Sequence, residues 1–230
     1  MLDIQKHKII LVQVLKDIYS DSQLATLLGF KGGTAAYLFY KLPRFSVDLD
    51  FNLLDPEKKN FVFEKIKNIL KKYGKIKEAR EKRFTLFFLL SYKEELRNLK
   101  IEISKKIFLN HYKIKNYLGI SMLVIEKQDM FAHKLVALLE RKQIANRDIF
   151  DIWWFAKNNW DINKKIVESR TKKKFKNYLK QCIKAVGRID NKYILQGLGD
   201  IIDERQKIWV KENLKKDTLF LLNFYLENYK

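Results

Sequence analysis

The chain has 230 residues, 47% of them hydrophobic and 13% aromatic, a composition that supports a folded core and excludes a disordered tail. Its 47 Lys and Arg residues against 27 Asp and Glu residues give a formal net charge of +20, which attracts polyanions such as nucleic acid. The lysine-rich composition of an AT-rich genome explains part of the excess, and a membrane surface or an acidic protein would satisfy the same charge. We favour a polyanion partner, because genome composition does not explain why acidic residues fail to balance the lysines.

Cysteine usage and the apolar runs exclude several classes of protein. Cys182 is the single cysteine, so the sequence predicts no internal disulfide and no Cys-based zinc site. The three histidines are scattered, which is more typical of packing or surface positions than of metal ligands. The first ten residues lack the apolar region of a signal peptide, and the longest apolar runs are too short to span a membrane. We therefore expect a soluble cytoplasmic protein with no membrane partner.

Hydrophobic periodicity predicts a mixed α/β arrangement in the first half of the chain. Amphipathic spacing predicts helices over residues 3–19, from Asp21 or Ser22 to about Gly29, over 35–41 and over 56–72. Between the second and third of these helices, residues 30–34 are predicted to form a tight glycine turn. Alternating or continuous apolar patterns predict strands over residues 47–53, 84–92 and 99–104, with a weaker pattern over 107–112.

The second half of the chain is predicted to be helical almost throughout, from Lys127 onward. Only 8 Gly and 2 Pro residues occur, and no Gly- or Pro-rich linker separates the two halves. We therefore expect an α/β (α+β) fold with a small mixed sheet in a domain over residues 1–125. A second, helical domain is expected over residues 126–230.

Two aspartates in the first predicted strand are the main candidates for catalysis. Asp48 and Asp50 are two residues apart, so both side chains project from the same face of that strand. Leu49 and Phe51 point to the other face, into a core. Two carboxylates that converge on one place repel each other unless a cation lies between them. Hard divalent cations with oxygen ligands, Mg²⁺ above all and Mn²⁺ as an alternative, suit such a pair.

A glycine turn before the aspartates is the second candidate element. Gly32 and Gly33 lack Cβ atoms, so the backbone can approach a phosphate closely. The helix that begins near Thr34 then offers unpaired N–H groups and the positive end of its dipole. Each part is a weak signal by itself, but a phosphate-binding turn beside a metal-binding Asp pair, with Arg44 and Ser46 between them, is the minimal arrangement for nucleotidyl transfer.

The run Lys-Gly-Gly-Thr-Ala from Lys31, followed by Arg-Phe-Ser-Val-Asp-Leu-Asp-Phe from Arg44, resembles the signature of AbiEii/AbiGii-type nucleotidyltransferase toxins. These toxins belong to the polymerase-β-like nucleotidyltransferase superfamily. The gap from Gly33 to Asp48 is longer than in many members of that superfamily, but it suits this family. The resemblance is sharp over residues 30–52, reappears near 99–104 and 130–155, and fades after about residue 160.

The resemblance implies a third carboxylate on a neighbouring strand, for which Glu102 is the candidate, with a solvent-facing edge residue as the alternative. It also implies that Lys134 contacts the triphosphate and takes part in catalysis. Asp148 and Asp151 would orient Lys134 or Arg141 or contact the nucleotide, although helix capping explains Asp148 equally well and the sequence does not separate the two acids. The implied nucleotide-binding residues are Lys31, Gly32, Gly33, Thr34, Arg44, Ser46, Lys134, Arg141, Asp148 and Asp151.

The activity that the resemblance implies is Mg²⁺-dependent transfer of a nucleoside monophosphate from an NTP to a hydroxyl of RNA, with the tRNA 3′ end as one acceptor. A toxin of this kind implies a cognate antitoxin as partner, within a toxin–antitoxin or phage-defence system. Basic runs interleaved with aromatic residues, such as residues 170–180, suit RNA, although such runs are often only solvated faces. The alternatives are nucleotidylation of a Ser, Thr or Tyr of another protein, and a non-catalytic RNA-binding module.

Overall fold

The computed structural model describes residues 3–93 and 96–228. The chain divides into two compact units, Met1–Glu126 and Lys127–Lys230. The first unit contains both strands and helices, and the regular elements of the second are helical. The predicted mixed α/β fold is confirmed. No helix of the described residues is long and apolar enough to cross a membrane.

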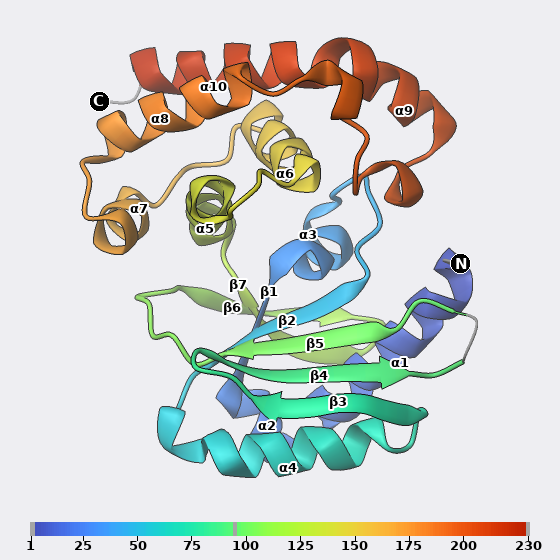
Figure 1. Ribbon diagram of the computed structural model, residues 1–230. Helices are drawn as coiled ribbons and strands as arrows, with labels where there is room; N and C mark the ends of the chain where they lie inside the picture. Colours follow the sequence, from blue (N-terminus) through green and yellow to red (C-terminus); the bar gives the residue numbers. More distant parts are fainter. Residues whose placement is uncertain (1–2, 94–95, 229–230) are drawn as a thin grey trace. The chain divides into compact units, whose positions relative to one another are not determined.

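In its described residues, the first unit contains the strands β1 (Leu28–Lys31), β2 (Asp48–Leu53), β3 (Lys75–Glu81), β4 (Thr85–Ser91), β5 (Leu99–Ser104), β6 (Tyr112–Tyr117) and β7 (Ile120–Ile125). They form one mixed sheet in the order β3-β4-β5-β2-β1-β7-β6 (Figure 1). β2 runs parallel to β5 and antiparallel to β1. Because hydrogen-bonded strands flank it on both sides, the backbone of β2 is held firmly in place.

The helices of the first unit are α1 (Ile4–Ser20), α2 (Ser22–Leu27), α3 (Gly32–Tyr40) and α4 (Lys59–Leu70), with a 3-10 turn at Pro56–Lys58. α1, α2 and α4 cover one face of the sheet, and α3 lies on the other (Figure 1). The Asp3 carboxylate accepts a hydrogen bond from the Lys6 backbone N–H and caps α1. Asp21 caps α2 in the same way, through the backbone N–H groups of Gln23 and Leu24.

The core of the first unit follows from the alternation of its central strands. Leu49 and Phe51 on β2 and Ile101 and Ile103 on β5 are fully buried. Each such side chain contributes roughly 1.5–3 kcal/mol through removal from water. The intervening residues of both strands therefore project to the opposite face of the sheet, which α3 covers only in part.

The second unit is built from α5 (Lys127–Glu140), α6 (Asn146–Lys157), α7 (Lys164–Thr171), α8 (Phe175–Gly187), α9 (Glu204–Trp209) and α10 (Lys215–Asn228), and a π turn at Val210–Leu214 joins the last two. α10 packs on α6 and α8, and α5 packs on α6 and α7 (Figure 1). The ring of Phe131 on α5 meets Phe155 and Tyr225 edge-on, with centroids 5.6 and 5.8 Å away. These aromatic contacts join α5, α6 and α10 into one core.

Several predicted elements differ from the structure. The predicted turn over residues 30–34 was wrong in part, since Phe30 and Lys31 end the strand β1 and α3 begins directly at Gly32. The strand predicted over residues 107–112 was also wrong except at its last residue. The next strand after β5 is β6, which begins at Tyr112 and pairs with β7 through a hairpin. β3 was missed because it is an edge strand of mostly Lys, Arg and Glu residues, with little apolar alternation.

Candidate active site

Asp48 and Asp50 lie on the face of β2 opposite the buried Leu49 and Phe51, as the sequence predicts. The Asp48 side chain retains 17% exposure. Burial and the nearby charge of Asp48 raise the pKa of the Asp50 carboxyl above its usual range. The structure therefore holds two carboxylates close together in a place where the second negative charge is unfavourable.

The glycine turn packs directly against these carboxylates. Gly32 has a φ of +77°, and a Cβ atom there would collide with the Asp50 carboxylate. A Cβ atom on Gly33 would lie 2.8 Å from the Ser46 Oγ atom and 2.9 Å from the Arg44 Nη2 atom. Both glycines are therefore required by close approach, and Gly32 also by its left-handed backbone. The amino end of α3 is consequently adjacent to Asp50.

Thr34, Arg44 and Lys31, which were also expected at the nucleotide site, lie at or near the glycine turn. Thr34 donates a short hydrogen bond from Oγ1 to the Asp48 carbonyl oxygen, which ties α3 to the start of β2. Arg44 is buried, and its Nη1 donates to the Phe45 carbonyl oxygen at 3.0 Å. Lys31 is half-buried, and its charge acts to lower the pKa of Asp50. Arg44 thus supports the turn from within, whereas Lys31 adds positive charge at the carboxylates.

Glu102 projects from β5, the strand directly beside β2. Its Cα pairs with that of Asp50 in the parallel register, and Lys100 pairs with Asp48. The Lys100 Nζ atom lies 3.2 Å from the Asp48 Oδ2 atom and 3.2 Å from the Glu102 Oε2 atom. Burial acts to lower the pKa of Lys100, but the charges of Asp48, Glu102 and Asp50 outweigh it and raise that pKa. A lysine ammonium therefore lies between two of the three predicted metal ligands.

The site fits a divalent cation held by the two aspartates of β2. Asp50 is buried beside another carboxylate, and oxygen donors of this kind suit Mg²⁺ or Mn²⁺. Over residues 3–93 and 96–228, no group of three or more His, Cys, Asp or Glu side chains is arranged to hold a metal ion. The role of Glu102 as a third ligand stays a prediction, since Lys100 contacts its carboxylate.

Lys134, Asp148 and Asp151 form a second polar cluster, within the helical unit. The Lys134 Nζ atom lies 2.8 Å from Asp148 Oδ1 and 2.8 Å from Asp151 Oδ2. The Arg141 Nε atom donates to Asp148 Oδ2, also at 2.8 Å. Both carboxylates are 0% exposed, while Lys134 and Arg141 are 14% and 43% exposed. The helical spacing of α5 thus brings both basic groups to the amino end of α6, as predicted.

The two acids of this cluster differ in their partners. Asp148 pairs with both basic side chains, and Asp151 pairs with Lys134. Burial acts to raise the pKa of the Asp148 carboxyl, but Lys134 and Arg141 outweigh it and hold that pKa below its usual value. Helix capping alone, the alternative for Asp148, is therefore an incomplete description. Asp148 is the residue that orients both basic groups.

Lys100 and His7 were not predicted from the sequence to take part in the site. Lys100 precedes Glu102 by two residues on a strand, and this spacing alone places both on one face, so the signal was present. His7 is buried, with its Nε2 atom 2.8 Å from the Val47 carbonyl oxygen and its Nδ1 atom 2.7 Å from the Tyr92 hydroxyl. His7 therefore fixes the backbone just before Asp48, a long-range contact that no local pattern predicts.

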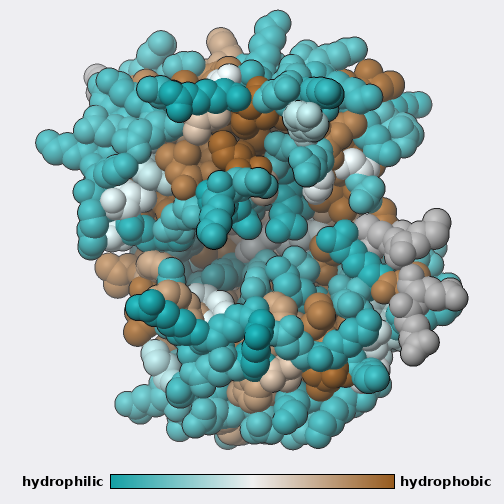
Figure 2. Space-filling view, in the orientation of Figure 1, coloured by the Kyte–Doolittle hydropathy of each residue, from teal (hydrophilic) through white to brown (hydrophobic). Residues whose placement is uncertain are grey.

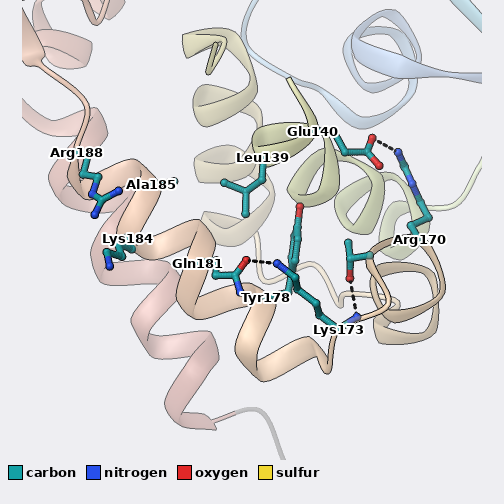
Figure 3. A pocket seen from close by; sticks show the side chains of 10 residues that line it. Leu139, Glu140, Arg170, Lys173, Tyr178, Gln181, Lys184, Ala185 and Arg188 are labelled. Atoms are coloured by element: carbon teal, nitrogen blue, oxygen red, sulfur yellow. Dashed lines mark hydrogen bonds and ion pairs between the residues drawn. The ribbon is translucent and has the colours of Figure 1, made fainter. Parts of the chain in front are cut away.

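A solvent-open pocket of about 540 Å³ lies on the helical unit, between α5, α7 and α8 (Figure 3). Four basic residues line it, namely Arg170, Lys173, Lys184 and Arg188. Arg170 donates to the Glu140 carboxylate at 2.6 Å, and the Lys173 ammonium donates to the Gln181 side-chain oxygen at 2.7 Å. The pocket is therefore electropositive, with a single carboxylate among its lining residues.

The chain is similar to a known protein family and to solved structures. A family model described as nucleotidyl transferase AbiEii toxin, type IV TA system, matches residues 13–207. A crystal structure of a candidate nucleotidyltransferase from Helicobacter pylori is similar, with a TM-score of 0.63 at 18% identity over 97% of this chain and 94% of the other. The crystal structure of JHP933 from the same organism gives 0.63 at 19% identity over 99% and 94%. The search of curated proteins found no match.

Proposed function

Because the chain belongs to the AbiEii family of nucleotidyl transferase toxins, we propose that it transfers a nucleoside monophosphate from an NTP to a hydroxyl of RNA, with Mg²⁺ as the metal ion. The enzyme is a nucleotidyltransferase, and its family uses an NTP and a divalent metal ion. Membership of a type IV toxin–antitoxin family also indicates an antitoxin as partner. The metal, the acceptor and the residue roles below are parts of the proposal.

The observation that carries the proposal is the contact between the Gly32-Gly33 turn and the Asp50 carboxylate. A Cβ atom on Gly32 would collide with that carboxylate, so the phosphate-binding backbone and the metal-binding acid are adjacent. α3 begins at Gly32, and Lys31 at its N-cap makes no side-chain capping hydrogen bond. Backbone N–H groups at the start of a helix bind phosphate oxygens. A nucleotide bound there would place its phosphates beside Asp48 and Asp50.

In the proposed reaction, the acceptor hydroxyl oxygen attacks the α-phosphorus of the NTP. A new P–O bond forms, the bond between the α-phosphorus and the bridging oxygen breaks, and pyrophosphate leaves. The hydroxyl proton passes to a basic group of the site, for which Glu102 is the candidate. When bound, Mg²⁺ or Mn²⁺ supplies positive charge that stabilises the developing negative charge on the phosphate oxygens.

We assign the helical unit a role in completing the nucleotide site. Lys134 is the candidate for contact with the triphosphate, with Asp148 and Asp151 holding its ammonium at a fixed place. A preorganised ammonium of this kind does not have to be reoriented during the reaction, which makes its charge effective. Arg141 is more exposed and shares Asp148, so we place it in nucleotide binding rather than in catalysis.

RNA is the proposed acceptor because positive charge is concentrated in one segment of the helical unit, residues 164–188. Residues 164–188 contain ten Lys or Arg residues against a single acidic residue, Glu168. Four of these basic residues line the pocket between α5, α7 and α8 (Figure 3), and Tyr178 contributes an aromatic side chain to its wall. Hydrophilic side chains also cover most of the face shown in Figure 2. Neither metal nor NTP binding needs so many cations, whereas an RNA backbone does.

The test is incubation of the protein with each α-labelled NTP, Mg²⁺, and either total cellular RNA or total cellular protein. We expect label in RNA, lost on treatment with ribonuclease, and no label when Asp48→Ala replaces the wild type. Label confined to a ribonuclease-resistant protein band would identify protein nucleotidylation and overturn the RNA assignment. An absence of label in either fraction with every NTP would overturn the proposed transfer reaction.

A further inference from the structure

Lys100 has no role in the proposed reaction, yet it makes direct ionic contacts with two of the carboxylates. Its Nζ atom lies 3.2 Å from an oxygen of Asp48 and 3.2 Å from an oxygen of Glu102. These are two of the three acids that would surround a pair of metal ions. The ammonium thus takes the place between Asp48 and Glu102 that a second divalent cation would need.

The position of this ammonium is fixed by the sheet. β5 is hydrogen-bonded to β4 on one side and to β2 on the other, and Lys100 pairs with Leu89 and Asp48 in the two registers. The neighbouring Ile101 is fully buried on the opposite face and anchors the strand. The Lys100 side chain is itself only 29% exposed. Lys100 therefore differs from a surface lysine, whose ammonium is mobile and hydrated.

The charges at the site show what this lysine does. Asp48, Asp50 and Glu102 would carry three negative charges close together, since Asp50 pairs with Glu102 across β2 and β5 and Lys100 contacts both Asp48 and Glu102. One ammonium and one divalent cation already carry as much positive charge as three carboxylates carry negative charge, and Lys31 adds a further positive charge that acts on Asp50. Two divalent cations in addition to the ammonium would leave an excess of positive charge before any nucleotide binds. Charge balance therefore favours one metal ion at the two aspartates of β2.

We propose that the Lys100 ammonium replaces one of two metal ions in this active site, so that the site without nucleotide binds a single divalent cation, for which Asp48 and Asp50 are the ligands. Glu102 then serves to hold Lys100 rather than to hold a metal ion. This inference rests on the proposed function, because it takes the three carboxylates as the site of nucleotidyl transfer. It adds a positioning residue and a metal stoichiometry to that site.

The experiment is a titration of the full chain with Mn²⁺ alone, in which electron paramagnetic resonance of free Mn²⁺ and calorimetry give the number of ions bound. We expect one Mn²⁺ per chain for the wild type and for Lys100→Arg, which keeps the charge. Lys100→Met and Lys100→Gln are each expected to bind two, or to bind the first ion at least ten times more tightly. Thermal unfolding of each variant shows whether it is folded.

Lys105→Met is the matched control. Lys105 follows the same strand, its side chain is 16% exposed, and it pairs with a carboxylate, Glu81, away from the two aspartates. Its loss removes the same charge and should leave one Mn²⁺ bound at wild-type affinity. Equal Mn²⁺ binding by the wild type and both neutral Lys100 variants would overturn the inference and leave the proposed function standing. Absence of Mn²⁺ binding by all of these proteins would instead overturn the metal site, and the proposed function with it.

Discussion

Two places in the molecule hold a lysine ammonium between two carboxylates, and they differ in charge balance. Lys134 lies 2.8 Å from both Asp148 and Asp151, whereas Lys100 lies 3.2 Å from both Asp48 and Glu102. The cluster on the helical unit contains two acids and two basic groups, since Arg141 also pairs with Asp148. The cluster on the sheet has a third acid, Asp50, on which the charges of both Lys31 and Lys100 act.

This difference shows in which cluster the negative charges are neutralised without a bound ligand. In the helical unit the basic groups hold the pKa of Asp148 low, so its negative charge is stabilised within the protein itself. On the sheet, burial and neighbouring acids raise the pKa of Asp50, so its negative charge is destabilised until a cation binds. The first cluster is neutralised within the protein, and the second is the cluster to which we assign the proposed metal ion. Four predictions test this contrast, and a fifth tests RNA binding.

The largest expected effect is on catalysis at the sheet. Asp48→Ala and Asp50→Ala should each lower the transfer rate by more than about 100-fold, because each removes a metal ligand. The measurement is incorporation of labelled NMP under saturating Mg²⁺, with circular dichroism to check the fold. Asp55→Ala, at an exposed turn outside the site, is the control. Near-normal turnover in either site variant would contradict the metal site.

The next effect concerns Lys134. Lys134→Ala should lose about 2–4 kcal/mol of transition-state stabilisation through loss of its contact with the triphosphate. The measurement is kcat/KM for the NTP, with Lys142→Ala, an exposed neighbour, as the control. Wild-type kinetics in Lys134→Ala together with severe impairment in Arg141→Ala would reassign the phosphate contact to Arg141.

A stability difference should separate Asp148 from Asp151. Asp148→Asn leaves Lys134 and Arg141 short of a buried partner and should lower the free energy of unfolding by about 3–5 kcal/mol, more than Asp151→Asn does. Because the folded-state pKa of Asp148 lies below the ordinary value of 3.8, the contribution of its ion pairs to stability is complete above that pH. The gap between wild type and Asp148→Asn should therefore shrink as the pH falls below about 3.8. A gap that stays constant down to pH 2 would contradict the ion pairs.

The opposite sign is expected for Asp50 in the absence of metal. The pKa of Asp50 is raised on folding, so ionisation of Asp50 costs stability as the pH rises above the ordinary value of 3.8. Asp50→Asn should therefore raise the melting temperature of the metal-free protein at neutral pH. Added Mg²⁺ should stabilise the wild type but not this variant. A metal-free Asp50→Asn protein that melts below the metal-free wild type would contradict a destabilising charge on Asp50.

The smallest effect concerns RNA affinity. If the pocket on the helical unit contacts phosphates, the double variant Lys184→Gln, Arg188→Gln should reduce the log–log salt slope of binding by roughly 1.4, near 0.7 per contact. Lys211→Gln with Lys216→Gln removes two exposed charges from the same unit and is the control. The measurement is fluorescence anisotropy with a labelled single-stranded RNA. Equal slopes for the two double variants would show that RNA does not use the pocket.

The amino-acid sequence alone determined the elements whose pattern is local. The alternation over β2 places Asp48 and Asp50 on one face of a strand, and the helical pattern predicts α5, which carries Lys134 and ends one residue before Arg141. The Gly-Gly pair predicted a close approach of the backbone to a phosphate; the close approach that the structure shows is to Asp50, Ser46 and Arg44. Period and residue type are sufficient for such features, since they depend on neighbours in the chain.

Only the tertiary structure decided which of these faces meet. The parallel register of β2 and β5 brings Lys100 beside Asp48 across a gap of 52 positions, and no periodicity predicts which strand becomes the neighbour of another. The short strand β1 and the charged edge strand β3 likewise depend on partners elsewhere in the sheet, because their own residues carry little apolar alternation. Strand pairing is a long-range choice, and for that reason the lysine at the carboxylates became visible only in the folded chain.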